Sequence, residues 1–195
     1  FDSFTTYDWY VLNNKNTKGD TVVNDSKGNI TYFDNINDWP FFPNHSYKVI
    51  QKLLGEGTNV ISDSSYHVEN LDNIQKNKTQ EYRFPLVHST PKSGPRIYYT
   101  NTKNRGHFGI TQMKFGETRI HDVNIDMKGE YRMTQGAIGL PVETLSEARA
   151  LKNMLESEAF QSIVLDACSW SLYRIDANIF KHFKKSWYHE DIMNV

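Results

Sequence analysis

The feature that most constrains the fold of this chain is a change in hydrophobic periodicity near Thr144. Between Tyr82 and Val142 the apolar residues form short segments bounded by Gly, Pro and Asn, which is typical of strands. From Leu145 onward they recur at the spacing of a helix. Strands in one part and helices in the next predict an α+β fold, with an antiparallel or mixed sheet and C-terminal helices packed on it.

Local signals set the bounds of these elements. The Asp126–Gly129 segment predicts a turn, and Thr144-Leu-Ser-Glu147 predicts a capping box at the start of a helix that Ser157 interrupts. Asp176 is a candidate N-cap for a last helix over Ile179–Phe183. The strand candidates are Phe84–His88, Arg96–Thr100, His107–Ile110, Gln112–Phe115, Ile120–Ile125 and Gly136–Val142.

The first part of the chain consists of strand and turn segments and one short helix. Thr21–Val23 and Ile30–Phe33 flank a Gly-containing polar turn and predict a hairpin. Ser46–Leu54 predicts a helix with Tyr47 on its apolar face and Gly55 as its C-cap.

The length of 195 residues suits one domain with a smaller annex. We expect residues 1–58 to form the N-terminal annex and residues 59–195 to form the α+β recognition core. Because the chain begins at Phe1 and not at Met, we expect a fragment of a larger protein. The chain has one cysteine, Cys168, which favours an intracellular compartment. We expect the cytoplasm, or, for a viral protein, the nucleus or a viral factory. No apolar run has the roughly 20 residues of a membrane helix, so no membrane partner is expected.

The common catalytic motifs are absent from the sequence. It contains no phosphate-binding Gly-rich loop, no G-x-S-x-G elbow and no H-E-x-x-H. One cysteine cannot supply a zinc site of the Cys–His type. We therefore expect no catalytic residue, no metal and no cofactor in this domain.

A stretch without acidic residues runs from Tyr82 to Gly116 and carries six Lys or Arg side chains. Because Lys and Arg supply most of the affinity for DNA phosphates, this stretch predicts a DNA-binding face. The alternative is a solvated sheet face whose charges point at water. A second basic cluster, Lys181 to Lys185, suits either a DNA contact or the end of a helix. The candidate DNA-binding residues are Lys92, Arg96, Tyr98, Lys103, Arg105, His107, Gln112, Lys114, Arg119, Arg132, Gln135, Trp170 and Arg174.

Residues 82–188 also carry segments that resemble a known family. The quoted segments are Tyr82-Arg-Phe-Pro-Leu-Val-His-Ser89, Arg105-Gly-His-Phe-Gly-Ile110, Lys114-Phe-Gly-Glu117, Asp126-Met-Lys-Gly-Glu-Tyr-Arg-Met-Thr134, Leu155-Glu-Ser157 with Phe160, and Trp170 to Phe183. They resemble the C-terminal target-recognition domain of N6-adenine DNA methyltransferases, especially single-chain type II restriction–modification enzymes, including those of large DNA viruses.

The resemblance implies a module that reads double-stranded DNA while a linked or associated methyltransferase domain binds S-adenosylmethionine and flips the target adenine. Arg96 or Arg105 would then bind guanine, and Gln112 or Gln135 would bind adenine.

Two other functions stay open at this point. One is a metal-dependent DNA endonuclease that uses Asp122, Asp126 and Glu130. The other is a non-catalytic protein-interaction or structural domain, in which the basic stretch is ordinary surface.

Overall fold

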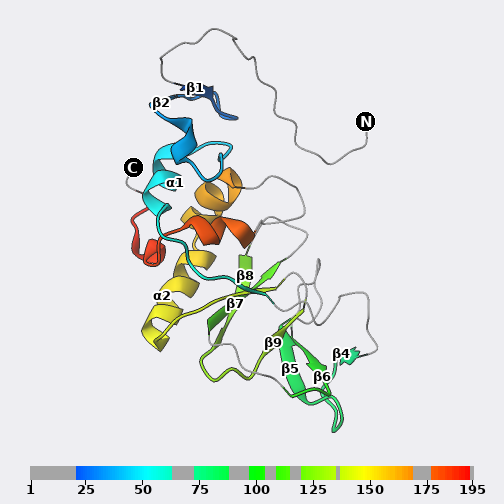
Figure 1. Cartoon of the computed structure of the whole chain (residues 1–195). Helices are drawn as coiled ribbons and strands as arrows, with labels where there is room; N and C mark the ends of the chain where they lie inside the picture. Colours follow the sequence, from blue (N-terminus) through cyan, green and yellow to red (C-terminus); the bar gives the residue numbers. More distant parts are fainter. Residues whose placement is uncertain are drawn as a thin grey trace, which may run out of the picture.

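A computed structural model describes residues 21–62, 73–87, 97–103, 109–114, 120–134, 137–168 and 177–193. Within them the strands form a two-stranded hairpin, a four-stranded sheet in the order β3-β10-β7-β8 and a second four-stranded sheet in the order β4-β6-β5-β9. The hairpin lies at one end of the molecule and the second sheet at the other (Figure 1). The strands are β1 (Thr21–Asn24), β2 (Ile30–Phe33), β3 (Ile61–Ser62), β4 (Ile74–Gln75), β5 (Phe84–Val87), β6 (Ile97–Thr100), β7 (Gly109–Lys114), β8 (Ile120–Asp126), β9 (Arg132–Met133) and β10 (Ile138–Leu140).

Two α-helices and four shorter helical segments complete the described part. α2 lies beside the β7–β8 pair (Figure 1). In the second sheet, β5 pairs parallel with β9, so that sheet is mixed. The predicted α+β class, an antiparallel or mixed sheet with C-terminal helices packed on it, is therefore confirmed, and the sheet beside α2 is the antiparallel one. The helical segments are η1 (Ile36–Asp38), α1 (Tyr47–Leu53), α2 (Leu145–Glu156), the π-helix η3 (Phe160–Leu165) and the 3-10 helices η4 (Ala177–His182) and η5 (Trp187–His189).

The predicted hairpin forms at β1 and β2, which pair antiparallel. Its turn is held by the Asp25 carboxylate, which accepts hydrogen bonds from the backbone N–H groups of Lys27 at 2.9 Å and Asn29 at 2.8 Å. Gly28 has a φ of 80°, a conformation that favours glycine. Phe33 carries the hairpin into the molecule, because its ring packs edge-on against Tyr47 at the start of α1.

α2 begins with the predicted capping box. The Thr144 hydroxyl accepts from the Glu147 N–H at 3.2 Å, and the Glu147 carboxylate accepts from the N–H groups of Glu143 and Thr144. The hydrogen bond from Glu143, followed by the one from Thr144, holds the pKa of Glu147 below its ordinary value. Ala148, Leu151 and Leu155 are buried at helical spacing, and the helix ends at Ser157 as predicted.

The main hydrophobic core joins α1, β8, β10, α2, η3, η4 and η5. At its centre four aromatic side chains from the C-terminal part have no exposed surface: Phe160, Phe180, Phe183 and Trp187. Burial of a phenylalanine side chain stabilises a fold by roughly 2 to 3 kcal/mol. Ile50 and Leu53 of α1 belong to the same core, so a helix of the predicted annex packs on the predicted recognition core. The division at residue 58 stays a prediction.

Cys168 lies at the edge of this core with 1% of its surface exposed. Burial raises the pKa of its thiol to about 12, because the charged thiolate loses its hydration. The thiol is therefore protonated at neutral pH, and a buried, protonated thiol is a poor nucleophile.

Three local predictions differ from the structure. α1 ends at Leu53, and its C-cap is Leu54 in an extended conformation. Gly55 is therefore not the predicted C-cap; instead it allows a close approach of Lys184. The two strands predicted around residue 111 are one strand, β7, which crosses a β-bulge where Asp122 and Val123 of β8 face Gln112. The last predicted α-helix is the 3-10 helix η4, and its predicted cap Asp176 lies outside the described residues.

Candidate nucleic-acid interface

Exposed cations lie on the segments that connect the strands of the β4-β6-β5-β9 sheet. Thr100 at the end of β6 pairs with Phe84 at the start of β5, so Arg83 and Lys103 leave the sheet at the same end. Lys76 and Lys78 lie on the connection from β4 to β5, which leaves β4 beside Tyr99 and returns to this end at Arg83. All four side chains are exposed, and we call them the sheet-end cations. In residues 73–87 and 97–103 these four cations stand against one carboxylate, Glu81, which leaves a local net charge of +3.

Within the described residues, three of the sheet-end cations have no acidic partner. Lys76, Lys78 and Lys103 form no ion pair within the part of the chain that the structure describes. Arg83 lies 5.1 Å from the centre of the Phe84 ring, a cation–π contact that leaves its charge in place. A surface of this kind attracts anions, and among the described residues no ion pair has to be broken first.

Tyr98, a candidate DNA-binding residue, is a packing residue in the structure. Its side chain is 5% exposed and lies in a small cluster with Ile74 and Leu86. Tyr99, on the opposite face of the strand, is half-buried. Because a ring that is buried in this way has no free face for a base, we leave Tyr98 out of the proposed contact surface.

The other candidate residues are spread over both sheets and beyond the described residues. Arg132 is half-buried on β9, where it pairs with Leu86 of β5. Gln112 and Lys114 lie on β7 in the other four-stranded sheet, where the structure describes only the backbone. The candidates outside the described residues are Lys92, Arg96, Arg105, His107, Arg119, Gln135, Trp170 and Arg174.

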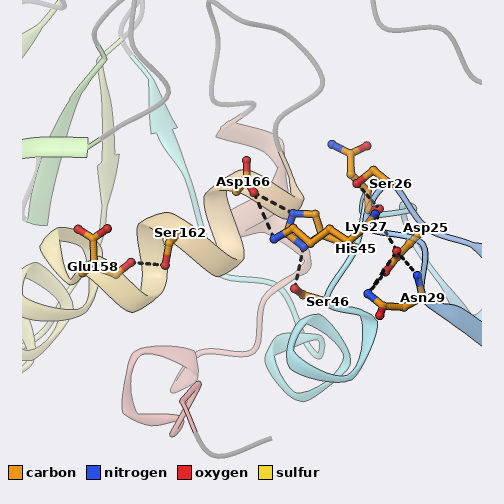
Figure 2. Close-up of polar contacts among 10 residues, drawn as sticks. Asp25, Ser26, Lys27, Asn29, His45, Ser46, Glu158, Ser162 and Asp166 are labelled. Carbon is orange, nitrogen blue, oxygen red and sulfur yellow. Dashed lines mark hydrogen bonds and ion pairs between the residues drawn. The ribbon is translucent and has the colours of Figure 1, made fainter.

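The structure contains a buried histidine near the hairpin for which the sequence analysis predicted no role. His45 is 2% exposed; its Nδ1 lies 2.7 Å from the Ser46 hydroxyl, and its Nε2 lies 3.0 Å from an Asp166 carboxylate oxygen (Figure 2). Lys27 of the hairpin turn reaches the same carboxylate at 3.5 Å. No local signal predicts this contact, because His45 and Asp166 are 121 residues apart.

Serine, histidine and aspartate are also the residue types of a nucleophilic triad. In such a triad the carboxylate is buried and orients the imidazole. Here the burial is reversed, because the Asp166 side chain is 60% exposed while the imidazole is enclosed. Adjacent backbone bonds, from Asn44 to Ala167 at 2.7 Å and from Ser26 to Asn44 at 3.0 Å, join the same three segments. We assign this cluster a structural role: it fastens the hairpin and the start of α1 to the end of η3.

Asp126, one of the three residues of the endonuclease alternative, closes a turn. Its carboxylate accepts from the N–H groups of Lys128, Glu130 and Tyr131 at 3.2, 3.0 and 2.8 Å. This is the turn that the sequence predicts at Asp126–Gly129, and Gly129 has a φ of 67° there. In the described part of the chain, no group of three His, Cys, Asp or Glu side chains is placed to hold a metal ion.

Comparisons with models of protein families, with curated proteins and with solved structures give no match. The resemblance of residues 82–188 to adenine-methyltransferase recognition domains therefore stays a prediction. Among the helices that the structure describes, none combines the length and the apolar composition that crossing a membrane requires.

Proposed function

We propose that this chain recognises double-stranded DNA and that the sheet-end cations contact its phosphates. The observation that carries the proposal is the local net charge of +3 on residues 73–87 and 97–103, in a chain whose overall net charge is −1. Phosphate contacts from Lys and Arg supply the sequence-independent part of DNA affinity. Lys76 directly follows β4 and Arg83 directly precedes β5, so the sheet supports these cations, as a surface that fixes register on a duplex requires.

Sequence-specific readout is the second part of the proposal, and it rests on the resemblance. If the resemblance holds, four side chains reach base edges in the major groove: Arg96, Arg105, Gln112 and Gln135. Arg suits guanine there, and Gln suits adenine. The catalytic steps belong to a linked or associated N6-adenine methyltransferase domain. That domain binds S-adenosylmethionine and pays the unstacking cost of a flipped adenine, a few kcal/mol in size.

Fluorescence anisotropy with a labelled duplex across a salt series tests the proposal. We expect the wild-type chain to bind with an affinity that falls steeply with salt, and Arg83→Ala/Lys103→Ala to reduce the log–log slope by about 2, since each phosphate contact contributes about 0.9. Arg149→Ala/Lys128→Ala is the matched control, because it removes one exposed arginine and one exposed lysine elsewhere on the described surface.

The outcomes separate the proposal from its alternatives. Absence of wild-type binding at low salt contradicts DNA recognition and favours an interaction domain. Equal slopes for the two double variants show that the sheet-end cations are ordinary surface charge. Arg96→Ala/Lys103→Ala/Arg105→Ala extends the test to the predicted loop residues, and unchanged binding by this triple variant contradicts their assignment.

A further inference from the structure

A second basic surface is assembled from two segments far apart in the sequence. The end of α1 and the residues after η4 lie side by side, joined by backbone hydrogen bonds. The Lys184 N–H donates to the Leu53 carbonyl at 2.8 Å, and the Gly55 N–H donates to the His182 carbonyl at 3.0 Å. Lys52 of α1 therefore belongs to the segment that borders residues 181–185. The C-terminal sequence alone does not show that Lys52 is near these residues.

A close contact at a glycine and two buried aromatic side chains fix the position of this junction. A Cβ atom on Gly55 would lie 2.6 Å from the Cβ of Lys184, so only glycine allows the two segments to approach this far. Phe183 and Trp187, which flank Lys184 and Lys185 in the sequence, are fully buried in the main core. The lysines therefore extend from a backbone that packing fixes on both sides.

The charge on this junction is only partly compensated. Lys184 forms an ion pair with Glu190 at 2.6 Å. Lys52, Lys181 and Lys185 are exposed and form no ion pair within the described residues; we call these three the lysine seam. In residues 47–58 and 181–190, five lysines stand against Glu56 and Glu190, which leaves a net charge of +3 with neutral histidines.

We propose that the lysine seam is a second contact surface for the phosphates of duplex DNA; this inference rests on the proposed function. Lysine is a compact charge on a flexible stem, which suits phosphates and does not read bases. The seam and the β5–β6 end of the small sheet lie in different parts of the molecule (Figure 1). The seam therefore adds a second set of phosphate contacts, whose affinity is independent of sequence, apart from those of the sheet-end cations.

The test uses the whole 195-residue chain and compares Lys52→Ala/Lys185→Ala with the control Arg149→Ala/Lys128→Ala. Each variant removes two exposed cations. We expect the seam variant to bind duplex DNA roughly tenfold or more weakly at about 0.1 M salt, with a log–log slope lower by about 2, and the control to bind like wild type. The loss is expected to be equal for specific and for random duplexes, because phosphate contacts carry no sequence information.

The single variant Lys52→Ala isolates the part of the inference that depends on the fold. A slope lower by about 1 supports the seam, whereas a wild-type slope for both seam variants overturns it. If the wild-type chain binds no duplex at all, the proposed function itself fails. If the wild type binds and only the sheet-end variant Arg83→Ala/Lys103→Ala lowers the slope, the proposed function stands and the seam inference is overturned. Seam-dependent binding to vesicles of anionic phospholipid without binding to DNA also overturns the inference, since the seam then serves a membrane surface.

Discussion

At the scale of single residues, two glycines differ in what they require from their surroundings. Gly57 faces the backbone of Lys181: an added Cβ would overlap the Lys181 carbonyl oxygen and lie 2.9 Å from its carbonyl carbon. Gly28 has nothing within 4 Å of such an atom, and only its φ of 80° favours glycine. We expect Gly57→Ala to destabilise the fold by about 3 kcal/mol, because two backbone segments must separate. Gly28→Ala should cost about 1 kcal/mol, the penalty of a left-handed L-residue.

Urea unfolding monitored by tryptophan fluorescence measures both changes. Trp187 is a suitable reporter, because it lies in the core beneath the segment that Gly57 contacts. If Gly57→Ala is no more destabilising than Gly28→Ala, the close approach of the two segments is contradicted. In that case the lysine seam also loses its support, since the same junction places Lys52 beside residues 181–185.

At the scale of elements, β8 is an edge strand whose free side is occupied by α2 and η3. The Val123 N–H donates to the Glu156 carboxylate at 2.8 Å, and the Lys152 ammonium donates to the Val123 carbonyl at 2.7 Å. Gln161 donates to the Ile120 carbonyl at 2.6 Å. These side chains form hydrogen bonds with backbone N–H and C=O groups of β8. A strand of a second chain could otherwise pair with those groups.

This arrangement predicts different effects for two substitutions at one position. Glu156→Ala leaves the Val123 N–H without its acceptor and should cost about 2 kcal/mol, the size of a hydrogen bond to a charged group. Glu156→Gln keeps an acceptor oxygen and should cost below about 1 kcal/mol. Hydrogen exchange at the Val123 amide is the direct readout: faster exchange is expected in the alanine variant only. Equal exchange in both variants would contradict the role of Glu156 at this edge.

The elements that the sequence predicts well are those that depend on near neighbours. The hairpin follows from its turn residues, and the start of α2 follows from Thr144 and Glu147. Contacts between distant segments were not predictable, such as the parallel β5–β9 pair and the bulge at Asp122. The alternation of a strand requires one of Tyr98 and Tyr99 to face inward, but only the packing of Ile74 and Leu86 decides that it is Tyr98.

The same limit applies to the candidate site. The deficit of acidic residues between 82 and 116 is visible in the sequence, and so is the C-terminal lysine cluster. The pairing that brings Arg83 and Lys103 to one sheet end follows from the register of β5 and β6. The addition of Lys52 to the lysine seam follows from backbone bonds between α1 and residues 182–184. Composition therefore predicts the charge, and tertiary pairing determines where it acts.

At the scale of the whole molecule, α1 links the two predicted parts of the chain. Ile50 and Leu53 have no exposed surface and belong to the same core as Phe183 and Trp187. We expect a fragment of residues 59–195, the predicted recognition core alone, to lose cooperative unfolding, because removal of α1 uncovers these aromatic side chains. Two buried aliphatic side chains alone account for roughly 3 to 6 kcal/mol, which is comparable to the total stability of many domains.

Adding residues 1–58 in trans provides the control for this truncation. If the loss of α1 is the cause, co-expression of the two pieces should restore a cooperative transition, and Ile50→Asp in the added piece should abolish the rescue, since it places a charge in the core. A 59–195 fragment that unfolds cooperatively at the wild-type midpoint would instead show two independent parts. The lysine seam would then span a boundary between them, and its DNA contact would depend on how firmly α1 docks.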